Sequence, residues 1–215
     1  MFVELIIFDL DGTLIDSSED IAACANKTLK AMGHKELGLD EIKQGIGWGV
    51  KMLFERLMPG ESPPAIDEAR RIFLGFYGDA PAVKTYAYPG VTETLRHFRR
   101  NGKKMAIVTN KPHGLANRIL CELDLSGSFE LVVGGDSFEN KKPHPEPLER
   151  VMKALNAAPE ASVIVGDSPV DCESGKKAGM STIGVSYGFR GAGELIEAGC
   201  DVIVDGFPVL KEILI

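Results

Sequence analysis

Six short runs of apolar, mostly β-branched residues limit most strongly the folds open to this chain. Each run is apolar at successive positions, which is typical of strands that are buried on both faces of a sheet. From residue 91 onward, segments with helical periodicity separate the runs, and this alternation favours a doubly wound α/β fold with a parallel sheet. The runs cover residues 3–8, 104–109, 131–135, 162–166, 181–185 and 201–204.

The interval between the first two runs breaks this alternation, because it contains three apolar stripes at helical spacing. The first of these helices is expected to begin near Asp16 or Ser17, either of which can cap it, and to end at Gly33. We therefore predict two domains: an α/β core formed by residues 1–15 and 84–215, and a helical cap formed by residues 16–83.

Polar side chains stand where several of the predicted strands end. Asp9 and Asp11 follow the first run, Thr109 and Asn110 end the second, and Asp167 follows the fourth. These side chains are expected to meet, because an open parallel sheet binds its ligands at the carboxyl ends of its strands. Two carboxylates about 4 Å apart repel by about 4 kcal/mol at an effective dielectric near 20, so a compensating charge is expected there.

A magnesium ion would supply that charge. Mg²⁺ prefers oxygen ligands and keeps several waters, which leaves room for a phosphate oxygen. Asp9 could then attack phosphorus to form an aspartyl-phosphate, with Asp11 as the acid and base. Thr109 and Asn110 can donate hydrogen bonds to phosphate oxygens, and Lys142 adds positive charge. The residues therefore predict Mg²⁺-dependent phosphoryl transfer.

Four motifs resemble, in order, those of the haloacid dehalogenase superfamily: DLDGTL at 9–14, VTN at 108–110, KKPHPEP at 141–147 and VGDSPVDCESGKKAGM at 165–180. The resemblance implies a Rossmann-like core with a cap inserted between the first two motifs. It also implies that Asp9 is the nucleophile, that Asp11 is the acid and base, and that Asp167 completes a Mg²⁺ site with Asp9 and the backbone carbonyl of Asp11.

The same resemblance implies roles for the surrounding residues. Thr109 and Lys142 would hold the phosphoryl group, with Gly12 and Asn110 beside it. Asp171 of the fourth motif would orient Lys142 or a metal-bound water, and Ser168 of the same motif would support the site from behind. Lys141 is expected to be a solvated neighbour of Lys142.

Longer stretches resemble the phosphoglycolate phosphatases of that superfamily, including YPGVTETL at 88–95 and VVGGDSFENKKPHPEPL at 132–148. This resemblance implies that the substrate is a small phosphorylated metabolite, and 2-phosphoglycolate is the leading candidate. The cap is expected to select the leaving group, and Gly47, Trp48 and Lys51 are candidates for contact with it. Trp48 stands where the family pattern leads us to expect a smaller or polar residue.

Other functions are compatible with the same core. A sugar phosphomutase would return the phosphoryl group to a sugar, and a pyrophosphatase or a phosphonate-cleaving enzyme would use the same nucleophile. A haloalkanoate dehalogenase is disfavoured, because it has no use for the acid and base that Asp11 supplies. A non-enzymatic sugar-phosphate sensor is disfavoured by the intact set of carboxylates and lysine.

Charge and hydropathy patterns limit the binding partners and the cellular location that can be expected. The net charge of −7 and the absence of a long Lys/Arg cluster disfavour a nucleic-acid surface. The chain starts without the pattern of a signal peptide and has no apolar stretch of membrane-spanning length, so a cytoplasmic protein without a membrane partner is expected. The sequence does not separate a monomer from a homodimer. Its cysteines are expected to be reduced, mostly core residues: Cys24, Cys121, Cys172 and Cys200.

Overall fold

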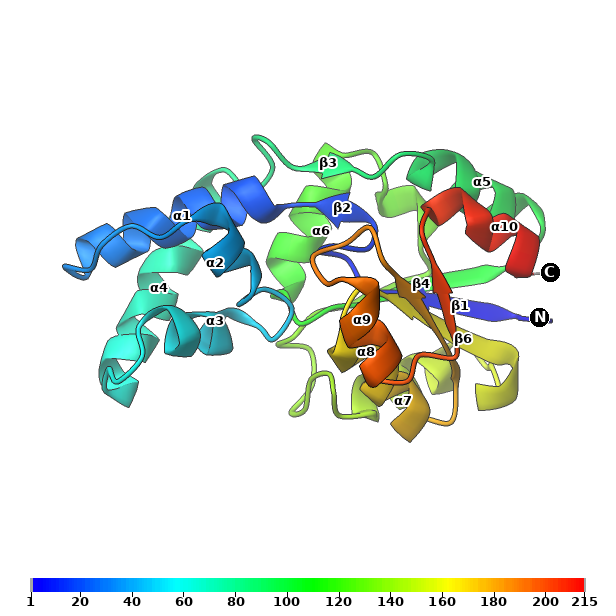
Figure 1. Cartoon of the computed structure of the whole chain (residues 1–215). Coiled ribbons are helices and arrows are strands. Elements are labelled where there is room, and N and C mark those ends of the chain that lie inside the picture. The colour runs from blue at the N-terminus through cyan, green and yellow to red at the C-terminus, as the bar shows by residue number, and fades with distance from the viewer. Residues whose placement is uncertain (1, 215) are drawn as a thin grey trace.

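The computed structural model describes residues 2–214 as a central parallel sheet between two layers of helices, with a further group of helices at one end (Figure 1). The six strands of the sheet lie in the order β5-β4-β1-β6-β7-β8, and all neighbours are parallel. The predicted doubly wound α/β fold is therefore confirmed. The strands are β1 Leu5–Phe8, β4 Lys104–Val108, β5 Leu131–Val133, β6 Ser162–Gly166, β7 Ser181–Val185 and β8 Val202–Val204.

Helices cover both faces of this sheet (Figure 1): α5 Val91–Arg100, α6 His113–Glu122, α7 Glu146–Ala154, α8 Pro169–Lys177, α9 Ala192–Glu197 and α10 Leu210–Ile213. Successive side chains of a strand point to opposite faces. Leu5 and Ile7 of β1 accordingly belong to the core cluster that includes α7, and Ile6 and Phe8 belong to the one that includes α5 and α6. None of the helices within residues 2–214 is long and apolar enough to cross a membrane.

The helical unit between β1 and β4, here called the cap, stands beyond the carboxyl ends of the strands (Figure 1). Its helices are α1 Ser18–Ala31, α2 Leu39–Lys43, α3 Val50–Leu57 and α4 Pro63–Asp79. Their apolar faces pack against one another, with the rings of Phe54 and Phe73 5.5 Å apart, edge to face, and this packing continues into the core cluster that includes α5 and α6. The cap therefore presents a preformed surface to the sheet edge.

A short ribbon joins the two connections between the cap and the sheet. Strand β2 (Ile15–Asp16) pairs antiparallel with β3 (Tyr86–Ala87), an element that the sequence analysis did not predict. Asp16 also starts α1, because its Oδ1 accepts hydrogen bonds from the backbone N–H (2.9 Å) and the hydroxyl (2.6 Å) of Ser18. Of the two capping candidates, Asp16 therefore fills this role, while Ser17 turns to the site described below.

The expectation that all cysteines are reduced is wrong for one pair. Cys172 of α8 forms a disulfide with Cys200, and their Cα atoms lie 5.3 Å apart. The two residues are 28 positions apart in sequence, and the packing of α8 beside β7 and α9 brings them together. Of the two free thiols, Cys24 is buried as expected, whereas Cys121 is exposed. Disulfides persist mainly in oxidising compartments, so the state of this pair in cells bears on where the protein works.

Candidate active site

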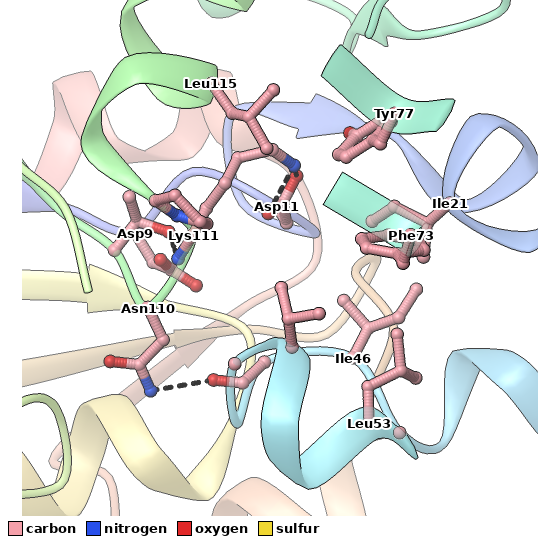
Figure 2. A pocket seen from close by; sticks show the side chains of 16 residues that line it. Asp9, Asp11, Ile21, Ile46, Leu53, Phe73, Tyr77, Asn110, Lys111 and Leu115 are labelled. Carbon is pink, nitrogen blue, oxygen red and sulfur yellow. Dashed lines mark hydrogen bonds and ion pairs between the residues drawn. The ribbon is translucent and has the colours of Figure 1, made fainter. Parts of the chain in front are cut away.

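Three parallel strands bring their polar ends together at the edge of the sheet that faces the cap, and Figure 2 shows Asp9 and Asn110 from two of these ends. Strand β1 pairs in register with β4 on one side and with β6 on the other, so the three strands end at the same level. Asp9 follows β1, Thr109 and Asn110 follow β4, and Asp167 follows β6. All four side chains are buried. Sequence-distant polar groups thus share one small region.

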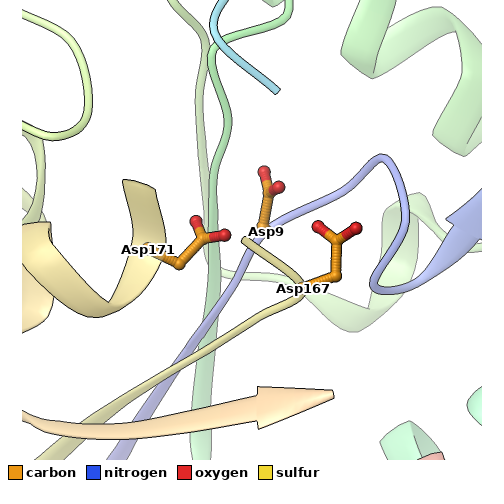
Figure 3. Close-up of side chains that lie close together, drawn as sticks. All are labelled: Asp9, Asp167 and Asp171. Carbon is orange, nitrogen blue, oxygen red and sulfur yellow. The ribbon is translucent and has the colours of Figure 1, made fainter. Parts of the chain in front are cut away.

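Asp9, Asp167 and Asp171 form a cluster of buried carboxylates (Figure 3). One oxygen from each lies within 4.8 Å of the others. Asp171 is held in the first turn of α8, where its Oδ2 accepts hydrogen bonds from the hydroxyl (2.7 Å) and the backbone N–H (3.2 Å) of Ser168. The reciprocal capping of α8 therefore fixes one member of the cluster.

Lys142 neutralises part of this negative charge. Its Nζ lies 2.6 Å from Oδ1 of Asp171 and 3.0 Å from Oδ1 of Asp9, and its side chain is 1% exposed. The Lys142–Pro143 peptide bond is cis, and the carbonyl of Lys142 accepts a hydrogen bond from the side-chain amide of Asn110 at 2.9 Å. The structure thus places Lys142, and not Lys141, among the carboxylates.

One ammonium does not balance three buried carboxylates. Burial raises the pKa of Asp9 to about 7, with Lys142 opposing the rise and Asp171 adding to it. Burial, together with Asp9 and Asp171, holds the pKa of Asp167 well above its ordinary value, even though the backbone N–H of Phe189 donates to its Oδ2 at 2.7 Å. A divalent cation would relieve this repulsion, so the donor set fits Mg²⁺.

Gly12 brings the backbone of the first motif up to the carboxylate cluster. Its φ is +83°, a conformation that L side chains rarely adopt, and a Cβ there would lie 2.2 Å from Oδ2 of Asp167. The close approach of this backbone to Asp167 agrees with a metal ligand provided by the main chain of Asp11. Position 12 therefore requires glycine for two reasons: its positive φ, and the lack of room for a Cβ beside Asp167.

The side chain of Asp11 faces away from the cluster, toward the cap (Figure 2). Its carboxylate accepts a hydrogen bond from the hydroxyl of Ser17 at 2.5 Å and pairs with Nζ of Lys111 at 2.7 and 2.9 Å. Asp11 therefore lies where a leaving group would enter, which suits an acid and base. Lys111 was missed as a site residue, although the polar run after β4 continues through it.

A loop of the cap closes over the site from the other side. The carbonyl of Gly47, at φ +100°, accepts a hydrogen bond from the side-chain amide of Asn110 at 2.9 Å. Arg190 of the core is buried, and its guanidinium donates hydrogen bonds to the carbonyls of Gln44 (2.7 Å) and Ile46 (3.0 Å) in the same loop. These bonds join the core to the cap at the mouth of the site.

The other two cap candidates lie outside the pocket. The Trp48 ring faces the guanidinium of Arg56 at 5.2 Å from the ring centroid, and Lys51 is exposed. Neither residue lines the pocket, whereas Gly47 does. The expectation that Lys141 is solvated is wrong, because its half-buried Nζ donates to the carbonyl of Trp48 at 2.9 Å. Burial of Lys141 between the loop and the core lowers its pKa.

A pocket that opens to solvent lies between the core and the cap (Figure 2). Its core side carries the polar groups, among them Asp9, Asp11, Asn110 and Lys111. Its cap side is mostly apolar, with side chains from α1, the 45–50 loop, α3 and α4: Ile21, Ile46, Val50, Leu53, Phe73 and Tyr77. The pocket therefore has room for a small molecule whose charged end meets the core.

The fold and the buried carboxylates at the ends of its strands are those of a class of hydrolases. A family model described as "Haloacid dehalogenase-like hydrolase" matches residues 6–185, and the chain belongs to this family. Two solved structures share the whole architecture. A predicted phosphoglycolate phosphatase from Haemophilus somnus 129PT is 29% identical, with a TM-score of 0.92 over 99% of this chain and 98% of that one. One from Lactobacillus delbrueckii is 28% identical, with a TM-score of 0.93 over 100% and 99%.

Curated relatives indicate which branch of the family this chain resembles. The phosphoglycolate phosphatase of Aquifex aeolicus is 41% identical over 187 residues, which cover 87% of this chain and 86% of the relative. That of Colwellia psychrerythraea is 36% identical, covering 96% and 95%. The protein is accordingly a phosphatase, a phosphoric monoester hydrolase that acts on small phosphorylated substrates.

Proposed function

We propose that this phosphatase hydrolyses 2-phosphoglycolate to glycolate and phosphate through a phosphorylated Asp9. The observation that carries the proposal is the position of Asp9, which lies in the carboxylate cluster and also lines the pocket beside Asp11. The phosphoglycolate phosphatases described above, 41% and 36% identical, support the substrate. The helical unit α1–α4 serves in this proposal as the domain that covers the bound ester.

The metal in this proposal is Mg²⁺, held by Asp9, Asp167 and the backbone carbonyl of Asp11. When bound, it supplies positive charge to the carboxylates and to a phosphate oxygen. Lys142 holds a second phosphate oxygen and, through its 2.6 Å contact, is kept in place by Asp171. Thr109 lies at the end of the neighbouring strand and donates to a remaining oxygen. The side-chain amide of Asn110 would donate to another only by releasing the carbonyl of Gly47 or Lys142, to which it is bonded in this structure.

The reaction has two steps on these residues. A carboxylate oxygen of Asp9 bonds to phosphorus, the bond from phosphorus to the bridging oxygen breaks, and Asp11 gives a proton to the departing glycolate oxygen. Asp11 then takes a proton from water, whose oxygen bonds to phosphorus and releases phosphate from Asp9. Asp9 and Asp11 are thereby restored to their starting states.

Phosphate release across a panel of esters tests the substrate. With Mg²⁺ present, we expect kcat/KM for 2-phosphoglycolate to exceed that for sugar phosphates by at least about 100-fold, because a site built to pair a substrate group rejects molecules that lack it. Pyrophosphate and a phosphonate belong in the panel as the substrates of the alternative enzymes. Equal rates for all esters would contradict the named substrate, and a requirement for a sugar bisphosphate would indicate a mutase.

Location and partners also belong to this proposal. We place the enzyme in the cytoplasm, where phosphorylated metabolites occur, and we assign it no nucleic-acid or membrane partner. The position of the pocket between the core and the cap supports a small substrate and not a polymer. Activity is proposed for the single chain, since every residue named for the reaction comes from it.

Metal-free protein is expected to lose stability as the pH rises from about 5 to about 8, and Mg²⁺ is expected to restore it. The pKa of Asp9 is about 7 when folded, above its ordinary value of 3.8. Between these values the folded chain holds a proton that the unfolded chain has released, so the free energy of unfolding falls as the pH rises. Thermal unfolding should show a Mg²⁺-induced rise in Tm of about 5 °C or more at pH near 8 and less than about 2 °C at pH near 5. An equal rise at both pH values would contradict the assignment of the cluster as the metal site.

A further inference from the structure

Lys111 is the one cationic side chain among the described residues that line the pocket (Figure 2). It follows β4 directly after Asn110, its side chain is 4% exposed, and its Nζ contacts both carboxylate oxygens of Asp11. Burial lowers the pKa of this lysine, but Asp11 and Tyr77 together raise it above its ordinary value. A buried lysine held in an ion pair therefore stands on the core side of a pocket whose cap side is mostly apolar.

Tyr77 places a second polar group beside Lys111, from the cap side. The tyrosine lies near the end of α4, and Nζ of Lys111 is 4.7 Å from the centroid of its ring. Its buried hydroxyl has the ammonium of Lys111 as a polar neighbour but no hydrogen bond of good geometry, and Tyr77 lines the pocket. A ligand in the pocket that accepts a hydrogen bond from this hydroxyl would pair it, and an unpaired buried hydroxyl costs about 1–3 kcal/mol. Burial raises its pKa to about 12, so the hydroxyl keeps its proton and can donate.

We propose that Lys111 and Tyr77 bind the carboxylate of the substrate, and that Lys111 exchanges Asp11 for this carboxylate when the substrate enters. The inference rests on the proposed function and names the substrate class, phosphate esters of 2-hydroxycarboxylic acids. In such an ester a single carbon separates the bridging oxygen from the carboxylate. The group that protonates the bridging oxygen and the group that binds the carboxylate must therefore be neighbours, as Asp11 and Lys111 are at 2.7 Å.

The exchange links recognition to catalysis. Before the substrate binds, Lys111 and Ser17 hold the carboxylate of Asp11. A substrate carboxylate competes for Lys111 and leaves Asp11 free to face the bridging oxygen. An ester that carries a neutral hydroxymethyl group in place of the carboxylate does not compete, so Asp11 stays paired with Lys111. Discrimination should consequently appear in kcat as well as in KM.

The other cations near the site are committed to different partners. Lys142 contacts the carboxylate cluster, Lys141 donates to the carbonyl of Trp48, and Arg190 donates to carbonyls of the 44–46 segment. Lys51, the cap lysine that the sequence suggested for this role, is exposed and does not line the pocket. The carboxylate therefore has Lys111 as its cationic partner among the described residues.

The test compares 2-phosphoglycolate with 2-hydroxyethyl phosphate, which has a neutral hydroxymethyl group in place of the carboxylate. The readout is the ratio of the two kcat/KM values, in which any general damage to catalysis cancels. We expect Lys111→Met to lower this ratio by about 100-fold, Tyr77→Phe by about 10-fold, and the matched control Lys51→Met to leave it unchanged. Thermal unfolding confirms that each variant is folded, and Tyr77→Phe keeps the test available if Lys111→Met is unstable. A ratio unchanged in Lys111→Met or, failing that, in Tyr77→Phe would overturn the proposal.

Inhibition by glycolate separates this proposal from the choice of substrate. Glycolate is expected to compete with 2-hydroxyethyl phosphate in the wild type, and its inhibition constant should rise by about 10-fold or more in Lys111→Met. If the wild type does not prefer 2-phosphoglycolate, the proposed substrate is wrong. In that case inhibition by glycolate that depends on Lys111 would still support the carboxylate site, and absence of inhibition would overturn it.

Discussion

Asp9→Asn is expected to lower kcat by at least about 10⁴-fold while the protein stays folded. The amide has the shape of the carboxylate but does not bond to phosphorus, and loss of a nucleophile removes most of the catalysis beyond binding. Lys142 keeps its 2.6 Å partner Asp171, so the variant has no unpaired buried ammonium. The measurement is phosphate release under saturating substrate and Mg²⁺.

The same substitution is expected to make the metal-free protein more stable at pH near 8. Burial holds the pKa of Asp9 at about 7, so the ionised carboxylate is a cost that the neutral amide removes. Asp16→Asn is the matched control, since Asp16 stands in the same segment, caps α1 and contacts the hydroxyl of Tyr86, outside the carboxylate cluster. It should keep kcat within a few-fold of the wild type. Turnover by Asp9→Asn within about 10-fold of the wild type would contradict the nucleophile assignment.

Lys142→Met is expected to have the largest effect on stability, and a large one on rate. It removes the ammonium from between Asp9 and Asp171, and breaking a buried ion pair by loss of one partner costs about 3–5 kcal/mol. Loss of the charge that faces the phosphoryl group should also lower kcat by about 100- to 1,000-fold. Denaturant unfolding of metal-free protein and steady-state kinetics measure the two effects.

The neighbouring lysine provides the control for this variant. Lys141→Met removes one hydrogen bond to the carbonyl of Trp48, so its cost in free energy of unfolding should be about 1 kcal/mol. The loss in Lys142→Met should also shrink at pH near 5, where Asp9 is protonated and less charge is left unpaired. Similar losses for both lysines at both pH values would show that Lys142 does not hold the cluster together.

Much of the fold could be predicted, because a strand that is buried on both faces of a sheet has apolar residues at successive positions. Each of the six apolar runs contains a strand of the sheet. The strands of three of these runs, β1, β4 and β6, end at one level and are followed by Asp9, Thr109 and Asp167. The β2–β3 ribbon escaped prediction, because two-residue strands carry no periodicity. Its pairing depends on where the cap connections meet in space.

The sequence predicted where strands end better than it predicted which side chains contact one another. Asp11 was expected near the metal, and only the folded chain shows its carboxylate turned toward Lys111 and Ser17. Tyr77 belongs to an apolar stripe of a cap helix, so nothing local marks its hydroxyl as part of the pocket. Cys172 and Cys200 likewise show no motif spacing, and their disulfide follows from the packing of two crossovers.

The sequence by itself determined the parallel α/β core, the helical insertion and the chemistry expected at the strand ends, because these depend on short-range patterns of burial and charge. Tertiary structure alone decided which of two adjacent lysines enters the carboxylate cluster, which acidic side chains share it, and which cap residues face the substrate. Those choices depend on the distances between segments far apart in the chain, such as the 100 positions between Asp11 and Lys111. No local pattern of residues encodes such distances.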